Sequence, residues 1–268
     1  MHKLFSIFGN PVSHSRSPLM HNSVFKNLNY NACYTRTLLK DGNKLKETFF
    51  SLGLSGANVT VPHKESAYAA CDEVRGFAKK IGVVNTLINE NGKLIGYNTD
   101  ADGFMYAINE FKNIQNILVL GAGGTAKALV QKFLEEGLHV SILNRSKARL
   151  TYFEKLDCEC YTWENFQPSQ YDLVINTTSA GLKDENLPAP KEMIEAALQN
   201  TRYVADAIYG RITPFLQLAK EKGLTCKDGA DMLLGQGVLA NELFCNFELD
   251  KEAIKKRCKK VFFTNEKS

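Results

Sequence analysis

The stretch Ile117-Leu-Val-Leu-Gly-Ala-Gly-Gly-Thr-Ala126 decides the fold of this chain. Its first four residues form a fully apolar run, which is typical of a parallel strand buried on both faces of its sheet. From Ala126 to Leu134 apolar residues recur at the spacing of an amphipathic helix, and Gly137 ends that helix. A glycine-rich turn between a buried strand and a helix predicts a site that binds the pyrophosphate of a dinucleotide.

Glycines in such a turn let the backbone approach a phosphate closely, and the first turn of the helix presents unpaired N–H groups to it. A purely structural tight turn is the alternative, and the flanking strand and helix argue against it. The third glycine of the fingerprint is replaced by an alanine, which the usual pattern permits. We therefore expect the cofactor phosphates at Gly121, Ala122, Gly123, Gly124, Thr125 and Ala126.

The segment after the next predicted strand, Val140–Leu143, favours NADP over NAD. An NAD site usually carries Asp or Glu there, which accepts a hydrogen bond from the ribose 2′-hydroxyl. This chain has no carboxylate at that place. Forked guanidinium donors can hold a 2′-phosphate dianion, and a serine hydroxyl can add a donor, if a helix begins inside the segment. The alternative is that the two arginines merely lie on an exposed helix. That alternative could account for Arg149 alone, but it accounts less well for all of these residues together. The candidate residues are Asn144, Arg145, Ser146 and Arg149.

The pattern on either side of residue 100 predicts an α/β protein of two domains. Beyond about residue 115 strands and helices alternate, as in a Rossmann-type dinucleotide-binding domain. The first hundred residues instead mix short strands and helices with a hairpin at Asn91-Gly92, which predicts an N-terminal α/β substrate domain. The last forty residues are predicted to be helical, and their pattern fits packing on either domain.

Composition and charge exclude several classes of protein. With 44% hydrophobic and 23% charged residues in 268, the chain is an ordinary globular protein. No apolar run approaches the roughly 18–20 residues that cross a bilayer, and the start lacks a signal peptide, so we expect a cytoplasmic protein with no membrane partner. The basic run Lys255–Lys260 is interpreted as a solvated helix face, so no nucleic-acid partner is expected.

The seven cysteines stand at irregular spacing, which indicates reduced thiols. Cys158-Glu-Cys160 lacks the second pair of ligands that a zinc site needs, and we interpret it as packing. No metal is expected.

Polar residues of the first domain stand where its predicted strands end. Ser15 and Ser17 precede a helix that begins at Pro18, and two hydroxyls at a helix N-terminus can hold a carboxylate. The alternative is that Ser17 only caps the helix. Asn58 and Thr60 alternate along a strand and share one side of it. Together with amides such as Asn85, these groups suit a small polyhydroxylated ligand.

Lys64 and Asp100 are the candidate groups for proton transfer. Lys64 follows the strand that Pro62 stops, and Asp100 lies 36 residues further on, in Asn98-Thr-Asp100. A lysine whose carboxylate partner is aligned can donate or accept a proton. Taken singly, each residue is better explained as a surface ion. His14 and His63 are assigned no catalytic role, because polar loops account for them.

Motifs along nearly the whole chain resemble those of the shikimate dehydrogenase family. Any one of them is modestly specific, and the set in this order is highly specific. They are Gly9-Asn-Pro-Val-Ser-His-Ser-Arg-Ser-Pro18, Asn58-Val-Thr-Val-Pro-His-Lys64, Ile81-Gly-Val-Val-Asn-Thr86, Asn98-Thr-Asp100, Gly121-Ala-Gly-Gly124, Asn144-Arg-Ser146, Asn176-Thr-Thr-Ser179, Asp206-Ala-Ile-Tyr209, and Gly229 through Gln236.

The resemblance implies a reversible, NADPH-dependent reduction of 3-dehydroshikimate to shikimate, on the route to chorismate and the aromatic amino acids. It implies that Lys64 and Asp100 are the catalytic pair. It also implies that Ser15 and Ser17 hold the substrate carboxylate, with Tyr209 at the same end. The groups that it places on the ring hydroxyls and the reacting oxygen are Asn58, Thr60, Asn85, Asp100 and Gln236. Those that it places beside the cofactor are Thr178, Ala207 and Gly229.

In the family the C-terminal helices return to the substrate domain. The predicted domains are therefore residues 1–100 with about 237–268 for substrate, and 101–236 for NADP. Two departures, Gly210-Arg211 in place of a proline segment and small changes within residues 176–181, affect the cofactor loops and leave the proposed pair intact. The oligomeric state is expected to be a monomer or a homodimer.

Two alternatives remain. An NAD-dependent quinate/shikimate dehydrogenase would share the fold and the pair, and the Arg145-Ser146-Arg149 set argues against it. A non-catalytic regulator that responds to NADP would be expected to have lost Lys64 or Asp100, and the chain has both.

Overall fold

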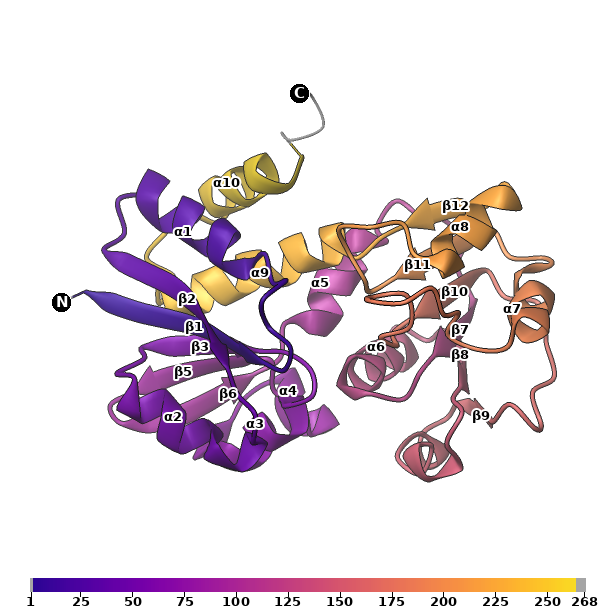
Figure 1. The fold of residues 1–268 in the computed structure, drawn as a ribbon, viewed down its shortest axis with the longest axis horizontal. Coiled ribbons are helices and arrows are strands. Elements are labelled where there is room, and N and C mark those ends of the chain that lie inside the picture. Colours follow the sequence, from indigo (N-terminus) through magenta and orange to yellow (C-terminus); the bar gives the residue numbers. More distant parts are fainter. Residues whose placement is uncertain (1, 264–268) are drawn as a thin grey trace. The chain divides into compact units, whose positions relative to one another are not determined.

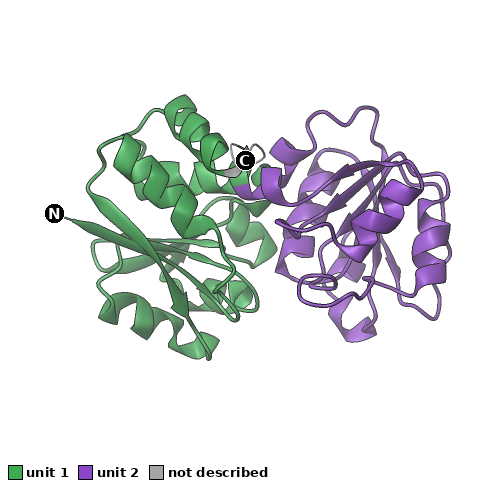
Figure 2. Ribbon diagram, turned by 45° about the horizontal axis from the view of Figure 1, so that its top comes forward, with its two compact units in different colours: residues 1–103, 234–268 green, residues 104–233 purple. Residues whose placement is uncertain are grey.

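In the computed structural model, which describes residues 2–263, the chain divides into two compact units (Figure 2). Unit 1 comprises residues 1–103 and 234–268, and unit 2 comprises residues 104–233. The chain passes from one unit to the other inside two helices, α5 (Asp100–Ala107) and α9 (Ala230–Phe244). The boundaries expected from the sequence, near residues 100 and 236, lie in the same two helices, while residues 264–268 of the expected first domain lie outside the described residues.

Unit 1 is built on a six-stranded sheet with the order β2-β1-β3-β5-β6-β4. The central strand β1 pairs in parallel with β2 and β3, whereas β5 runs antiparallel to both of its neighbours. The β5–β6 hairpin turns at Asn91 and Gly92, which both have positive φ, as a two-residue hairpin turn requires. The strands are β1 (Lys3–Gly9), β2 (Ala32–Leu38), β3 (Gly56–Val59), β4 (Glu73–Val74), β5 (Thr86–Glu90) and β6 (Lys93–Tyr97).

Helices cover both faces of this sheet (Figure 1). On one face a short 3-10 turn (Gly42–Lys44) and α2 (Leu45–Ser51), α3 (Lys64–Ala70) and α4 (Phe77–Ile81) enclose a cluster that includes Phe8, Phe49 and Leu87. On the other face α1 (Ser17–Asn27) and the end of α9 bring Phe25 and Phe244 against Phe5, with ring centroids 5.5 and 4.6 Å from that of Phe5. The C-terminal helix α10 (Lys251–Phe263) packs against α1.

Unit 2 is built on a parallel sheet with the order β12-β11-β10-β7-β8-β9. This is the strand order of a Rossmann-type domain, with the crossover beside β7. The predicted α/β class is thus confirmed. The strands are β7 (Asn116–Leu120), β8 (His139–Leu143), β9 (Glu159–Tyr161), β10 (Leu173–Asn176), β11 (Tyr203–Asp206) and β12 (Thr225–Lys227).

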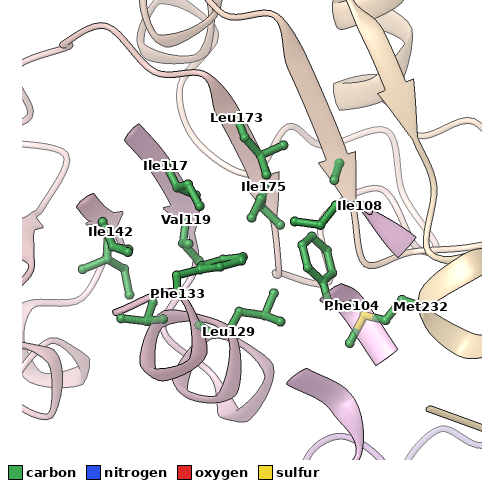
Figure 3. Close-up of a cluster of buried hydrophobic side chains, with 14 of the residues drawn as sticks. Phe104, Ile108, Ile117, Val119, Leu129, Phe133, Ile142, Leu173, Ile175 and Met232 are labelled. Atoms are coloured by element: carbon green, nitrogen blue, oxygen red, sulfur yellow. The ribbon is translucent and has the colours of Figure 1, made fainter. Parts of the chain in front are cut away.

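The apolar run of β7 is buried on both faces because its residues alternate between two clusters. Ile117 and Val119 belong to the cluster that Leu129 and Phe133 of α6 (Gly124–Glu135) complete (Figure 3). Leu118 and Leu120 face the opposite cluster, which α7 (Lys191–Leu198) and α8 (Pro214–Glu221) cover. Each residue of this run is at most 1% exposed, so the strand that was predicted from the apolar run is confirmed.

Some elements are shorter than the sequence predicts, and others were not predicted from the sequence at all. The strand that Pro62 was expected to stop already ends at Val59. The short elements β9, β12, α3, α4 and α7 were not predicted, because three to eight residues show too little periodicity. No helix within residues 2–263 combines the length and the apolar character that a membrane span requires.

Candidate active site

Lys64 and Asp100 form a buried ion pair in unit 1. The Lys64 Nζ lies 2.6 Å from Asp100 Oδ2, and the two side chains are 11% and 8% exposed. Lys64 is the first residue of α3, which follows β3, and Asp100 is the first residue of α5, which follows β6. Each charge offsets the cost of burying the other. The alternative that each residue is a surface ion is therefore wrong.

One amide holds the carboxylate of Asp100 from its other side, and a second holds its backbone. Asn85 Nδ2 donates to Asp100 Oδ1 at 2.9 Å, and the Asp100 backbone N–H donates to Asn98 Oδ1 at 3.0 Å. The amide of Asn85 is itself fixed, because its Oδ1 accepts from Thr99 N and Thr86 Oγ1, both at 2.9 Å. Oδ2 of Asp100 is thus held toward Lys64.

Asn58 extends this network toward the sheet. It is 5% exposed, and its Nδ2 donates to Thr86 Oγ1 at 3.1 Å and to the Asn85 carbonyl at 3.3 Å. Its Oδ1 accepts from the hydroxyl of Tyr34 at 2.7 Å. Hydrogen bonds therefore connect Tyr34 on β2 to Asp100 through three intervening side chains, and Asn58, Asn85, Asp100 and Lys64 belong to one assembly.

Tyr34, which donates to Asn58, and His21, which stacks on Tyr34, were not among the site residues expected from the sequence. Tyr34 stacks on the ring of His21, with centroids 4.3 Å apart and planes 11° apart. Both side chains are buried, and burial lowers the pKa of His21 to about 4, so its ring is neutral near pH 7. The only available signal was the alternation in Ala32-Cys-Tyr-Thr-Arg-Thr-Leu38, which puts Tyr34 on one side of its strand.

Ser15 and Ser17 form a separate buried pair. Ser15 Oγ donates to Ser17 Oγ at 3.2 Å and accepts from the Ser17 backbone N–H at 3.3 Å. The N-cap of α1 is Arg16 with no side-chain cap, so the interpretation of Ser17 as the cap is wrong. On β2, Arg36 donates to the Ser15 carbonyl through Nε at 3.0 Å and Nη2 at 2.5 Å, which fixes this loop.

Thr60 and Gln236 are placed by close packing against glycines of unit 1. Thr60 follows β3, and its methyl group contacts Gly9, where an added Cβ would lie 2.5 Å from Thr60 Cγ2. Gln236 is on α9, whose backbone packs closely on Gly103 of α5. A role for either residue at the substrate stays a prediction.

The glycine-rich loop of unit 2 has the geometry of a phosphate cradle. Gly121 has a φ of +99°, and a Cβ there would lie 2.7 Å from Thr178 Cγ2. A Cβ on Gly123 would meet no atom within 4 Å, so the backbone there borders open space. The twelve-residue α6 begins at Gly124 with no acidic residue in its first turn. Thr178 is held by Asn176, whose Oδ1 accepts from its N–H and its hydroxyl at 2.9 and 2.8 Å. Thr125 is half-buried in the first turn of α6, and the buried Ala122 and Ala126 complete the loop.

The cationic residues after β8 lie on the surface of unit 2. Asn144 is tied to the end of β9, because its N–H donates to the Tyr161 carbonyl at 3.0 Å. Arg145, Ser146 and Arg149 are exposed. The helix on which the two-arginine clamp was conditional is a 3-10 turn of three residues, Lys147–Arg149.

Ala207 and Gly229 lie together at the end of β11. The Gly229 N–H donates to the Ile208 carbonyl at 2.9 Å, and a Cβ on Gly229 would collide with the Ala207 carbonyl, so only glycine fits. Tyr209, also in unit 2, is half-buried in the loop that follows.

Asp206, at the end of the same strand, was not among the expected site residues. It is 1% exposed and accepts hydrogen bonds from Thr213 Oγ1, Asn176 Nδ2 and Ile208 N, at 2.7, 3.1 and 2.9 Å. Burial raises the pKa of its carboxyl to about 6. The residue joins the ends of β10 and β11 to the start of α8.

All seven cysteines are free thiols. Among residues 2–263, no three His, Cys, Asp or Glu side chains gather as a metal ion would need.

Comparisons with known proteins agree along nearly the whole chain. Residues 7–87 match the family described as the shikimate dehydrogenase substrate binding domain. A shikimate dehydrogenase (NADP(+)) of Helicobacter hepaticus is 45% identical over 249 residues, which cover 92% of either chain. Shikimate dehydrogenase 1 of Peptoclostridium difficile superposes with a TM-score of 0.85 at 28% identity, covering 97% of both chains. Shikimate 5-dehydrogenase of Thermus thermophilus, solved with NADP(H) and shikimate, gives 0.80 at 31% identity, covering 97% of this chain and 99% of that chain. This chain belongs to the shikimate dehydrogenase family.

Proposed function

We propose that this chain catalyses the reversible NADPH-dependent reduction of 3-dehydroshikimate to shikimate, on the route to chorismate and the aromatic amino acids. The observation that carries the proposal is the buried Lys64–Asp100 pair, which Asn85 fixes from the far side. Relatives named shikimate dehydrogenase (NADP(+)) that match nine-tenths of the chain support it. We place the reaction in the cytoplasm, with a monomer or a homodimer as the active form and no nucleic acid involved.

In this proposal Lys64 completes the reduction of the ketone. When bound, NADPH supplies the hydride to the carbonyl carbon, and the carbonyl oxygen then carries negative charge and must gain a proton. Lys64 Nζ stabilises that charge and gives the proton, and Asp100 Oδ2 orients the ammonium group. In the reverse direction the same nitrogen takes the proton from the substrate hydroxyl.

Unit 1 holds the substrate. Ser15 and Ser17, at the start of the eleven-residue α1, bind its carboxylate through their hydroxyls and the positive end of the helix. The ring hydroxyls are bound by Asn58, Thr60, Asn85 and Gln236. The hydrogen-bonded network around Asn85 supports this assignment, because it fixes polar atoms before the substrate arrives.

Unit 2 holds NADP. Gly121, Ala122, Gly123, Gly124, Thr125 and Ala126 cradle the pyrophosphate at the start of α6, where the open backbone at Gly123 fits a phosphate. Arg145, Ser146 and Arg149, with Asn144 beside them, bind the 2′-phosphate. The segments that carry Thr178, Ala207 and Gly229 hold the nicotinamide half.

The direct test is the oxidation of shikimate by NADP, followed as absorbance at 340 nm. The expected result is turnover with shikimate and NADP, and much weaker turnover with quinate or with NAD. Binding of NADP without any turnover would contradict the proposal and favour the regulator. Comparable rates with quinate and NAD would favour the quinate/shikimate enzyme.

A further inference from the structure

Trp163 is the single tryptophan of the chain and lies outside every motif that carried the family resemblance. Its ring faces Arg145, whose Cζ is 5.9 Å from the ring centroid. A guanidinium group within about 6 Å of an indole face is attracted by the negative potential of the ring. The residue that is proposed to bind the 2′-phosphate therefore rests on an aromatic side chain.

The sheet places these two residues together. Leu143 at the end of β8 pairs with Tyr161 at the end of β9, so Arg145 and Trp163 each stand two residues beyond a paired position. The Asn144 N–H donates to the Tyr161 carbonyl at 3.0 Å, which extends the pairing by one residue. The contact thus follows from the strand register.

Trp163 is also fixed from its own side. Asn165 Oδ1 accepts from Thr162 N at 2.7 Å, and the Asn165 N–H donates to the Thr162 carbonyl at 3.4 Å, so a tight turn encloses Trp163. The indole packs on the buried cluster that contains Leu118, Leu120 and Leu143. The ring is half-buried, whereas Arg145 is exposed.

We propose that Trp163 is a positioning residue that holds the Arg145 guanidinium for the 2′-phosphate and thereby strengthens the preference for NADPH over NADH. A guanidinium stacks through its face and donates hydrogen bonds from its edge, so the indole leaves the forked donors available to a phosphate. An exposed arginine without this support would have to lose its rotational freedom when the cofactor binds. The inference rests on the proposed function in that the cofactor is NADP and Arg145 binds its 2′-phosphate.

The kinetic test compares three variants with both cofactors. Trp163→Leu is expected to raise the KM for NADPH about two- to fivefold, the scale of one exposed cation–aromatic contact, with the KM for NADH and kcat unchanged. Trp163→Phe keeps an aromatic ring face and is expected to raise the KM for NADPH by a smaller factor. Phe166→Leu is the matched control, because Phe166 packs edge-on against Tyr161 in the same loop, with centroids 5.6 Å apart. Equal losses with NADPH and NADH, or an equal loss in Phe166→Leu, would overturn the proposal.

A binding test needs no turnover, because Trp163 is the only tryptophan fluorophore. Adenosine 2′,5′-bisphosphate is expected to change the Trp163 emission in a saturable way, at concentrations at least tenfold below those of adenosine 5′-monophosphate. Arg145→Ala is expected to abolish that difference between the two nucleotides. Equal responses to both nucleotides, or an unaltered response in Arg145→Ala, would contradict the inference.

The two tests separate this inference from the proposed function. A selective response to the bisphosphate in a protein that does not oxidise shikimate would leave Trp163 in its role and remove the proposed activity. Oxidation of shikimate by NADP with no cofactor-selective loss in Trp163→Leu would keep the activity and remove the role of Trp163.

Discussion

The candidate sites of the two units differ in whether their charged side chains are buried or exposed. In unit 1, Lys64 and Asp100 are buried and paired, and the neutral amide of Asn85 holds Asp100. In unit 2, Arg145 and Arg149 are exposed on the surface. Removing one partner of a buried pair leaves an uncompensated buried charge, which costs about 3–5 kcal/mol, whereas removing an exposed arginine leaves no buried charge behind. Substitutions in the buried site should therefore have the larger effects.

The largest effect is expected for Lys64→Ala. It removes the proposed proton donor, so kcat should fall by roughly two to four decades, with a smaller change in KM for shikimate. Initial rates at 340 nm over a range of shikimate concentrations measure both constants. A KM that rises steeply while kcat holds would show that Lys64 only binds substrate.

Asp206 is a second buried carboxyl with a different environment. Neutral donors hold it, whereas Asp100 is paired with the ammonium group of Lys64. Burial raises the pKa of Asp206 from 3.8 to about 6 in the folded state. The unfolded state therefore loses its proton first as pH rises, and folding stability falls between about pH 4 and pH 6. A shift of about two pKa units corresponds to up to about 3 kcal/mol.

Urea unfolding of the wild type and of Asp206→Asn, from pH 4 to pH 7, measures the pH-dependent contribution of Asp206 to the unfolding free energy. The asparagine keeps an oxygen acceptor and does not titrate, so the difference in unfolding free energy between the two proteins should shrink as pH rises. A difference that does not change with pH would show that folding leaves the pKa of Asp206 unshifted.

Arg145→Ala tests the exposed site. It removes a charged donor to the proposed 2′-phosphate, which is worth about 1.5–3 kcal/mol, so the KM for NADPH should rise about tenfold to a hundredfold. The KM for NADH should change little. Steady-state kinetics with both cofactors measure the ratio, and equal effects on both would refute the phosphate clamp.

Much of unit 2 could be predicted from the sequence, because β7 is almost uniformly apolar and α6 is long and strongly patterned. The apolar run of β7 and the helical stripe of α6 are local signals that tertiary contacts reinforce. Trp163 could not be predicted, since it follows β9, a three-residue strand that has no signal of its own. The sequence predicted the segment after β8 that carries the two arginines, but it did not predict the 3-10 turn in that segment.

The network of unit 1 depends on sheet register, which no local pattern contains. Tyr34 and Asn58 lie on β2 and β3, with β1 between them, and the pairs Phe5–Tyr34 and Ile7–Asn58 fix their levels in the sheet. The Tyr34 hydroxyl therefore reaches Asn58 only once three strands are aligned. Lys64 and Asp100 were predicted as candidates by type and position, and their contact required the fold.

A smaller effect is expected for Tyr34→Phe, at the far end of the buried network. It deletes the hydroxyl that donates to Asn58, a bond worth about 0.5–1.5 kcal/mol, so kcat/KM for shikimate should fall about two- to tenfold. The KM for NADPH should stay unchanged. Tyr30→Phe is the matched control, because the Tyr30 hydroxyl contacts Lys3 and the Phe244 carbonyl, outside the network. An equal loss in both variants would mean that only general stability had changed.

The claim that Lys64 and Asp100 act as one unit is tested most directly by a double-mutant cycle on kcat. Lys64→Ala, Asp100→Ala and the double variant are compared with the wild type in the oxidation of shikimate. Residues that act together give strongly non-additive effects. The expected result is a double variant with about the kcat of the slower single variant. Multiplied losses would show that the two residues act independently and would contradict the pair.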